Sequence, residues 1–199
     1  MTTIDAPAAR AGRAAALPPE ERRAALVAAT LPLLLRAGQA VTTKQIAEAA
    51  GVAEGTIFRA FPDKDSLIAA AVEHAFDPAP LEHALAAIDD ALSFEDRLLA
   101  ALDIILRRAT DIWQLVAVVG HQHLPAERTH GGDQHRMTEL VALTEMFAAE
   151  HHRLRIDPRQ AGQLFRAVIL AGNHPAMRTD EPLPPATLVS LFLDGVRTS

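Results

Sequence analysis

Four histidines in segment 121–135 are the residues of this sequence whose type and spacing are best suited to chemistry. They are His121, His123, His130 and His135. With a nearby carboxylate such as Asp133, their imidazoles could hold zinc or nickel, or serve a His/Asp hydrolase. The prolines and glycines of the segment predict an exposed loop instead, and no nucleophile elbow, phosphate loop or pair of carboxylates accompanies it. We therefore predict no catalytic residue, no metal and no cofactor, with a metal-responsive segment His121–His135 kept as an alternative and a hydrolase less favoured.

A different pattern lies at residues 43–62, where small and apolar residues are spaced for two short helices that cross steeply. Such a pair needs a small residue where the helices cross, a turn residue that accepts a positive φ, and an apolar side chain between the helices. Ala47, Gly51 and Val52 meet these needs. The other inward positions are also small or apolar: Ile46, Ala50, Ile57 and Ala60. The pattern predicts a helix-turn-helix, against the plainer alternative of a helical hairpin within a core.

Residues 42–67, TTKQIAEAAGVAEGTIFRAFPDKDSL, resemble the DNA-binding region of the TetR family of transcriptional regulators (TetR/AcrR type). The similarity extends over about residues 19–76, and the rest of the chain resembles the family only in helical content and length. The resemblance implies a homodimeric repressor whose three N-terminal helices bind a double-stranded, palindromic DNA operator, and whose helical C-terminal domain binds a small-molecule inducer. An activator stays open, and an architectural DNA-binding protein without a ligand is less favoured because the chain is acidic.

In that arrangement the second helix, predicted at 54–60, enters the major groove, where the base edges carry an unambiguous code. Arg59 is then placed to bind guanine through two hydrogen bonds. We expect DNA contacts from nine residues: Thr42, Thr43, Lys44, Glu54, Gly55, Thr56, Phe58, Arg59 and Lys64. The alternatives are that Thr43 is merely an N-cap, that Lys64 is solvated, and that Arg59 pairs with an acidic residue.

Two positions depart from the family pattern. Phe58 stands where a tyrosine usually donates its hydroxyl to a phosphate, and the chain has no tyrosine at all. Ala53 stands where a capping Ser or Thr is common, so the second helix is expected to lack that cap, at a cost of about 1 kcal/mol. Both departures affect the expected affinity for DNA and leave the resemblance intact.

The 199-residue chain has a net charge of −6, but the acidity is confined to its C-terminal part. Residues 1–76 contain eight basic and eight acidic residues, whereas residues 77–199 contain eleven and seventeen. The N-terminal part can therefore still present a local basic face to DNA. The lack of cysteine excludes disulfides and thiolate metal sites. No apolar run reaches the ~20 residues that cross a bilayer, so we expect a soluble cytoplasmic protein with no membrane partner.

Helical periodicity predicts an all-α fold with three parts. Residues 1–17 are expected to form a flexible arm. The resemblance implies that residues 18–76 are the DNA-binding domain and that residues 77–199 are a helical bundle for ligand binding and dimerisation. The boundary is placed at Asp77-Pro78-Ala79-Pro80, where two prolines stop a helix. Beyond it, helices are predicted at 81–90, 94–109, 111–120, 135–151, 158–172 and 185–197.

Two sets of apolar residues in the C-terminal part are candidates for binding. The first would line a pocket for a hydrophobic ligand: Trp113, Val116, Met137, Met146 and Phe147. The second would form a dimer interface on the last two helices: Phe165, Ile169, Leu188, Leu191 and Phe192. For both sets the alternative is a place in the core, because an apolar stripe on a helix is more often core than binding site.

Overall fold

The computed structural model describes residues 18–120, 139–177, 181 and 183–198, and in these ranges it consists of helices and short 3-10 turns, with one isolated antiparallel bridge between Leu154 and Arg197. The N-terminal elements are α1 (Pro19–Ala37), η1 (Gly38–Ala40), α2 (Thr43–Ala49), η2 (Glu54–Thr56), α3 (Ile57–Ala60) and α4 (Lys64–Ala75). The C-terminal elements are α5 (Ala79–Ala86), α6 (Phe94–Val119), α8 (Val141–Ala148), η5 (His151–Arg153), α9 (Pro158–Asn173) and α10 (Pro185–Val196). The predicted all-α class is confirmed. No helix in these ranges is both long and apolar enough to span a membrane.

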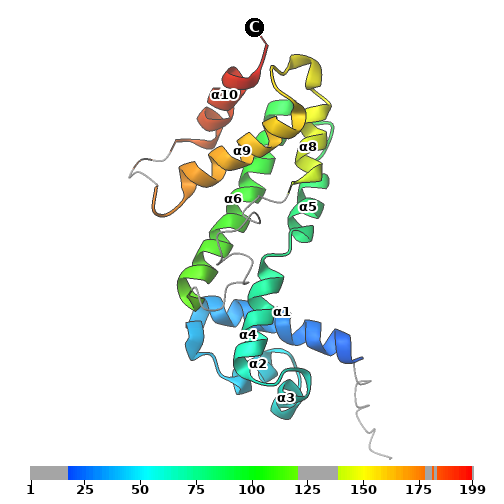
Figure 1. Ribbon diagram of the computed structural model, residues 1–199, viewed down its shortest axis with the longest axis vertical. Helices are drawn as coiled ribbons and strands as arrows, with labels where there is room; N and C mark the ends of the chain where they lie inside the picture. The colour runs from blue at the N-terminus through cyan, green and yellow to red at the C-terminus, as the bar shows by residue number, and fades with distance from the viewer. Residues whose placement is uncertain (1–17, 121–138, 178–180, 182, 199) are drawn as a thin grey trace, which may run out of the picture.

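Helix α6 is one continuous helix of 26 residues, and the predicted break between 109 and 111 is wrong. Ser93 caps its start by accepting a hydrogen bond from the Asp96 backbone N–H at 3.1 Å. The Thr110 hydroxyl, which could have marked a helix end, donates to the Leu106 carbonyl at 2.8 Å and so lies within the helix. In Figure 1, α6 runs the length of the C-terminal part and reaches α1 with its last turns.

The buried side chains form two clusters. One joins α1, α2, α3 and α4, and it is completed by Leu115 and Val119 from the last turns of α6. The other lies among α5, α6, α8, α9 and α10 (Figure 1) and contains four phenylalanines whose rings meet at 5.0–6.0 Å: Phe94, Phe147, Phe165 and Phe192. Because α6 contributes to both clusters, it connects them physically.

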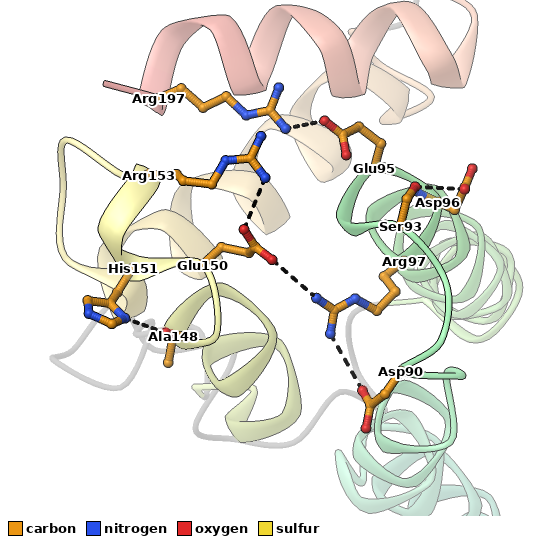
Figure 2. A network of polar contacts seen from close by, with 10 residues as sticks. All are labelled: Asp90, Ser93, Glu95, Asp96, Arg97, Ala148, Glu150, His151, Arg153 and Arg197. Atoms are coloured by element: carbon orange, nitrogen blue, oxygen red, sulfur yellow. Dashed lines mark hydrogen bonds and ion pairs between the residues drawn. The ribbon is translucent and has the colours of Figure 1, made fainter. Parts of the chain in front are cut away.

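A polar network connects the start of α6 with the loop before it, with the residues around η5 and with the segment after α10 (Figure 2). Arg97 lies between Asp90, at 3.5 Å, and Glu150, at 3.8 Å, and Glu150 also accepts a hydrogen bond from Arg153 at 3.1 Å. A second pair, Arg197 of the segment after α10 with Glu95 of α6, lies beside it.

The hydrogen bond from the Arg197 guanidinium favours the ionised carboxylate and lowers the pKa of Glu95. Nothing in the local sequence pattern pointed to these contacts.

Candidate nucleic-acid interface

The turn between α2 and η2 has the geometry that its sequence predicts. Gly51 has a φ of 66°, a value that L-residues with a side chain rarely adopt. The Val52 backbone N–H donates to the Ala47 carbonyl at 2.9 Å, which closes the turn onto α2. Ala47, the small residue predicted where the helices cross, is 3% exposed, so its side chain is covered. These features confirm the predicted helix-turn-helix at this point of the chain.

The inward positions of the motif are covered as expected. Ile46 and Ile57 are fully buried, and Ala50, Val52 and Ala60 are half-buried against the same cluster. Phe61, which follows the motif, is 1% exposed and belongs to that cluster too. The apolar residues of the motif thus pack the two short helices against α1 and α4. The outward side chains of these helices are not part of the cluster.

Thr42, rather than Thr43, is the N-cap of α2, so the predicted alternative of Thr43 as an N-cap is wrong. The Thr42 side chain accepts from the Gln45 backbone N–H at 3.2 Å, and the Gln45 side chain accepts from the Thr42 backbone N–H at 2.8 Å. This reciprocal capping box satisfies two backbone donors that would otherwise lack partners. Thr43 is the first helical residue, and its hydroxyl donates to Glu54 Oε1 at 2.6 Å.

The segment predicted as one helix at 54–60 is divided into the 3-10 turn η2 and the four-residue helix α3. Ala53 precedes it without any side-chain cap, as its residue type predicts. The outward side chains of the segment are open to solvent: Phe58 is 56% exposed and Arg59 is exposed as well. Within the described ranges no carboxylate forms an ion pair with Arg59, so its guanidinium stays available to another partner.

Arg23 is a residue of this region that the sequence analysis missed. Its Nη1 donates to the Ala60 carbonyl at 2.7 Å, and its guanidinium lies 3.9 Å from the centre of the Phe61 ring. A cation at the C-terminal end of a short helix stabilises the free carbonyls there. Arg23 therefore fixes the end of α3 from α1, across 37 positions of the chain, a distance over which no local pattern could have revealed it.

Lys64 and Asp63 fix the start of α4. The Asp63 carboxylate accepts from the Ser66 backbone N–H at 2.7 Å, and hydrogen bonds from Ser66 lower the pKa of Asp63. The Lys64 ammonium donates to the Gln39 carbonyl at 2.7 Å, so it is neither simply solvated nor free of a protein partner. Two further hydrogens of that ammonium are not used by this bond.

Contacts from α6 reach two places in the N-terminal helices: η1, between α1 and α2, and the end of α4. The Gln39 side chain donates through Nε2 to the Val119 carbonyl, in the last turn of α6, at 2.7 Å. Arg108, farther back on α6, donates to the Ala75 carbonyl and, at 2.9 Å, to the Asp77 carbonyl. A displacement of α6 would therefore act on η1 and on the end of α4 at the same time.

Comparison with known proteins finds a family model that matches this part of the chain. Residues 26–71 match the model of bacterial regulatory proteins of the tetR family. The N-terminal unit, α1 to α4, is therefore similar to the DNA-binding region of that family. The matched residues lie within the range over which the sequence resembles that family, so the predicted resemblance is confirmed. No curated protein matches the chain.

Solved structures extend the likeness in fold to the rest of the chain. A TetR transcriptional regulator from Streptomyces coelicolor is 25% identical, with a TM-score of 0.52 over 88% of this chain and 98% of that one. A TetR family transcriptional regulator from Pseudomonas syringae is 20% identical, with a TM-score of 0.50 over 90% and 99%. A protein from Vibrio parahaemolyticus assigned to the same family is 21% identical, with a TM-score of 0.56 over 89% and 100%.

The described residues that were predicted to line a ligand pocket lie in two different places. Met146 and Phe147 are buried in the C-terminal cluster, whereas Trp113 and Val116 are half-buried on α6. The Trp113 ring meets the His174 ring at 5.1 Å, edge to face. Met137 lies outside the described residues, as does the histidine segment 121–135. A ligand-binding role for these residues stays a prediction.

The residues predicted to form a dimer interface lie mostly inside the core of the chain itself. The buried ones are Phe165, Ile169, Leu188 and Phe192. Leu191 is 57% exposed, and its counterpart on α9 is Leu164, which is 46% exposed and was not selected from the sequence. Contacts of α9 and α10 with a second copy of the chain stay a prediction. Exposed side chains such as Leu164 and Leu191 would have to supply the apolar surface of that interface.

Proposed function

We propose that the chain is a TetR-family transcriptional regulator that binds a palindromic DNA operator as a homodimer, and that a small hydrophobic ligand releases it, which makes it a repressor. The observation that carries the proposal is the exposed outer side of residues 54–60. Arg59 and Phe58 are open to solvent there, and the core does not use them. A free guanidinium can bind the O6 and N7 atoms of guanine through two hydrogen bonds, which discriminates against other bases by about 1–3 kcal/mol.

Phosphate contacts would come from the residues around that segment. Lys44 is exposed on α2, and the ammonium of Lys64 keeps two hydrogens beyond its bond to Gln39. The hydroxyl of Thr42 is engaged with Gln45, and that of Thr43 with Glu54. We therefore assign the two lysines the larger share of the backbone contacts.

A homodimer is proposed because a single short recognition segment makes too few contacts for a specific site. Two copies related by a two-fold axis would place their recognition segments about 34–36 Å apart, in successive turns of the major groove. Leu164 on α9 and Leu191 on α10 are exposed apolar side chains on the two helices that we expect to pair.

The ligand is proposed to act through α6. Trp113 and Val116 lie on this helix, a few residues before the turns that pack on α1 and bond to Gln39. A hydrophobic molecule bound beside them would favour one position of α6 over another. Because α6 contacts both η1 and the end of α4, the spacing of the two recognition segments would change with it.

The decisive experiment is the selection of duplexes from a random pool, followed by footprinting on the selected site. Arg59→Ala should weaken binding to that site by about 5- to 100-fold, from the loss of one bidentate contact, and should affect random DNA little. Arg107→Ala removes the same charge from an exposed position on α6 and serves as the matched control. Equal losses on selected and random DNA would contradict base reading by Arg59.

The homodimer and the ligand have their own tests. Sedimentation at the concentrations that bind DNA should give twice the mass of the chain, and a monomer there would contradict the dimer. Trp113 is the only tryptophan, so its fluorescence can be followed while a broad set of hydrophobic compounds is added. If no compound changes that fluorescence or releases DNA, the proposed sensing function is wrong.

A further inference from the structure

Glu54 is an anionic residue in the middle of the surface that we propose to face DNA. It is the first residue of η2, it is exposed, and within the described ranges it forms no ion pair with any lysine or arginine. A carboxylate near phosphates is repelled by them, so its presence lowers affinity for every DNA sequence alike. The backbone of DNA therefore offers Glu54 no favourable contact.

The position of the Glu54 carboxylate is fixed by the helix that precedes the turn. The Thr43 hydroxyl donates to Oε1 at 2.6 Å, across 11 positions of the chain. Thr43 is itself half-buried at the first position of α2, so the donor has a defined place. This bond orients the carboxylate and leaves its other oxygen, Oε2, to accept from outside.

The surroundings of Glu54 permit the edge of a base pair to approach. Gly55 follows it, and a Cβ atom placed on Gly55 would meet nothing within 4 Å. Phe58 lies one helical turn farther on, and its ring is 56% exposed. Arg59 is the next exposed residue and supplies only donors. The segment thus offers an acceptor at its start and a donor at its end.

The chemistry of the major groove limits what an acceptor can bind there. Guanine and thymine present acceptors in the major groove, and these repel a carboxylate. Adenine presents its N6 donor beside the N7 acceptor, which opposes a carboxylate on the same edge. Cytosine presents the N4 amino group, a donor, without an acceptor next to it on its own edge.

We propose that Glu54 is a specificity-determining residue that accepts a hydrogen bond from the N4 amino group of a cytosine in each half-site, with Thr43 as its positioning residue. This assignment rests on the proposed function, because it requires that residues 54–60 enter the major groove. In this assignment the negative charge of Glu54 has two effects. It lowers the affinity for random DNA, and it raises the preference for cytosine at one position.

The test is a parallel selection of random duplexes by the full-length wild type and by variants at two positions. Glu54→Ala should lose the cytosine preference at one position of each half-site and keep the preferences elsewhere. Glu54→Gln should turn that preference toward adenine, because a glutamine amide matches the N6 and N7 atoms of adenine. Thr43→Val keeps the shape of Thr43 but removes its hydroxyl, so it should weaken the cytosine preference and leave the other positions unchanged.

The size of the effect can be measured on the selected operator. Replacing the cytosine by thymine should weaken binding by the wild type about 5- to 100-fold and binding by Glu54→Ala little. Glu73→Gln removes an exposed carboxylate from α4 and is the matched control for charge. Circular dichroism melting of each variant shows that loss of preference does not come from unfolding.

The outcomes separate this assignment from the function on which it rests. An unchanged motif with Glu54→Ala, or an equal gain in affinity for every sequence, would show that Glu54 only repels phosphates and would overturn the assignment while leaving the proposed function in place. If selection with the wild type enriched no DNA sequence at all, both the proposed function and this assignment of Glu54 would be wrong.

Discussion

The N-terminal unit, α1 to α4, and the C-terminal helices, α5 to α10, are built on different principles. The elements of the first that we propose to face DNA are very short: α2 has seven residues, η2 three and α3 four. Helices of this length do not form by themselves in water, so each depends on side chains from outside it. In the second region, α6 has 26 residues and α9 has 16, and they pack through broad apolar faces.

This difference explains which contacts hold each region. The N-terminal elements are fixed by a few hydrogen bonds at their ends: the reciprocal pair between Thr42 and Gln45, the bond from Arg23 to the Ala60 carbonyl, and the bond from Lys64 to the Gln39 carbonyl. The C-terminal helices are held by a group of phenylalanine rings, with ion pairs at one end. A region of short elements tolerates few residue types at its critical positions, whereas many apolar residues can fill a broad helical interface.

The largest effect on stability is expected in the C-terminal cluster, from Phe147→Ala. Phe147 is fully buried, and its ring meets those of Phe94, Phe165 and Phe192 at 5.5 to 6.0 Å. Removing it leaves a cavity and should lower the free energy of unfolding by about 3–5 kcal/mol, measured by urea denaturation.

The unfolding curve of Phe147→Ala also tests how separate the two regions are. Leu115 and Val119 of α6 lie in the N-terminal cluster, so we expect one cooperative transition that includes both regions. Two separate transitions would show that the N-terminal unit does not depend on α6. Phe58→Ala is the control: Phe58 is 56% exposed, and its loss should change stability by less than about 0.5 kcal/mol.

The two regions also differ in how well their structure could be predicted from the sequence. The helix-turn-helix was predictable because Ala47, Gly51 and Val52 each satisfy a separate geometric requirement within a few positions. The division of 54–60 into η2 and α3 was missed, because residue spacing does not distinguish a 3-10 turn from the first turn of an α-helix. The contact of Arg23 with Ala60 was missed because the residues near Ala60 in the sequence do not indicate that a side chain from another helix caps α3.

In the C-terminal region the helical content was predicted correctly, but the bounds of some helices were wrong and the role of each apolar face stays a prediction. An apolar stripe shows that a face is covered, but the covering group can be the core, a ligand or a second copy of the chain. Phe165 and Phe192 are on the helices predicted for dimerisation, yet their rings are buried inside the chain. The predicted break between 94–109 and 111–120 was wrong, because the Thr110 hydroxyl bonds within the continuous α6.

A smaller effect is expected at the turn that defines the N-terminal unit. Gly51→Ala puts a side chain on a residue with a φ of 66° and should lower the free energy of unfolding by about 1–2 kcal/mol. The matched control is Gly55→Ala, since Gly55 does not have a positive φ and a Cβ there meets nothing within 4 Å. Gly55→Ala should leave thermal stability unchanged and weaken DNA binding, because the added methyl group keeps the backbone from the groove. Equal destabilisation by both substitutions would show that the turn does not depend on the conformation of Gly51.

The smallest effect is expected from the ion pair between Glu95 and Arg197, at the end of the C-terminal region farthest from the recognition segment. The hydrogen bond from Arg197 lowers the pKa of Glu95, so the folded state is stabilised above the ordinary glutamate value of 4.5. This contribution is lost as the pH falls through the lowered pKa, where the carboxylate becomes protonated in the folded state as well. Both side chains are partly exposed, which limits the contribution to less than about 1 kcal/mol.

Glu95→Gln should therefore lower the free energy of unfolding at pH 7 by that amount, and the difference from the wild type should shrink as the pH is brought down to 3. Urea denaturation at a series of pH values measures it, with Glu145→Gln, an exposed carboxylate on α8, as the control. A difference that stays constant between pH 7 and pH 3 would mean that Glu95 acts through its shape rather than its charge. Since DNA binding should not change in either variant, this experiment also separates the stability of the C-terminal region from the function of the N-terminal one.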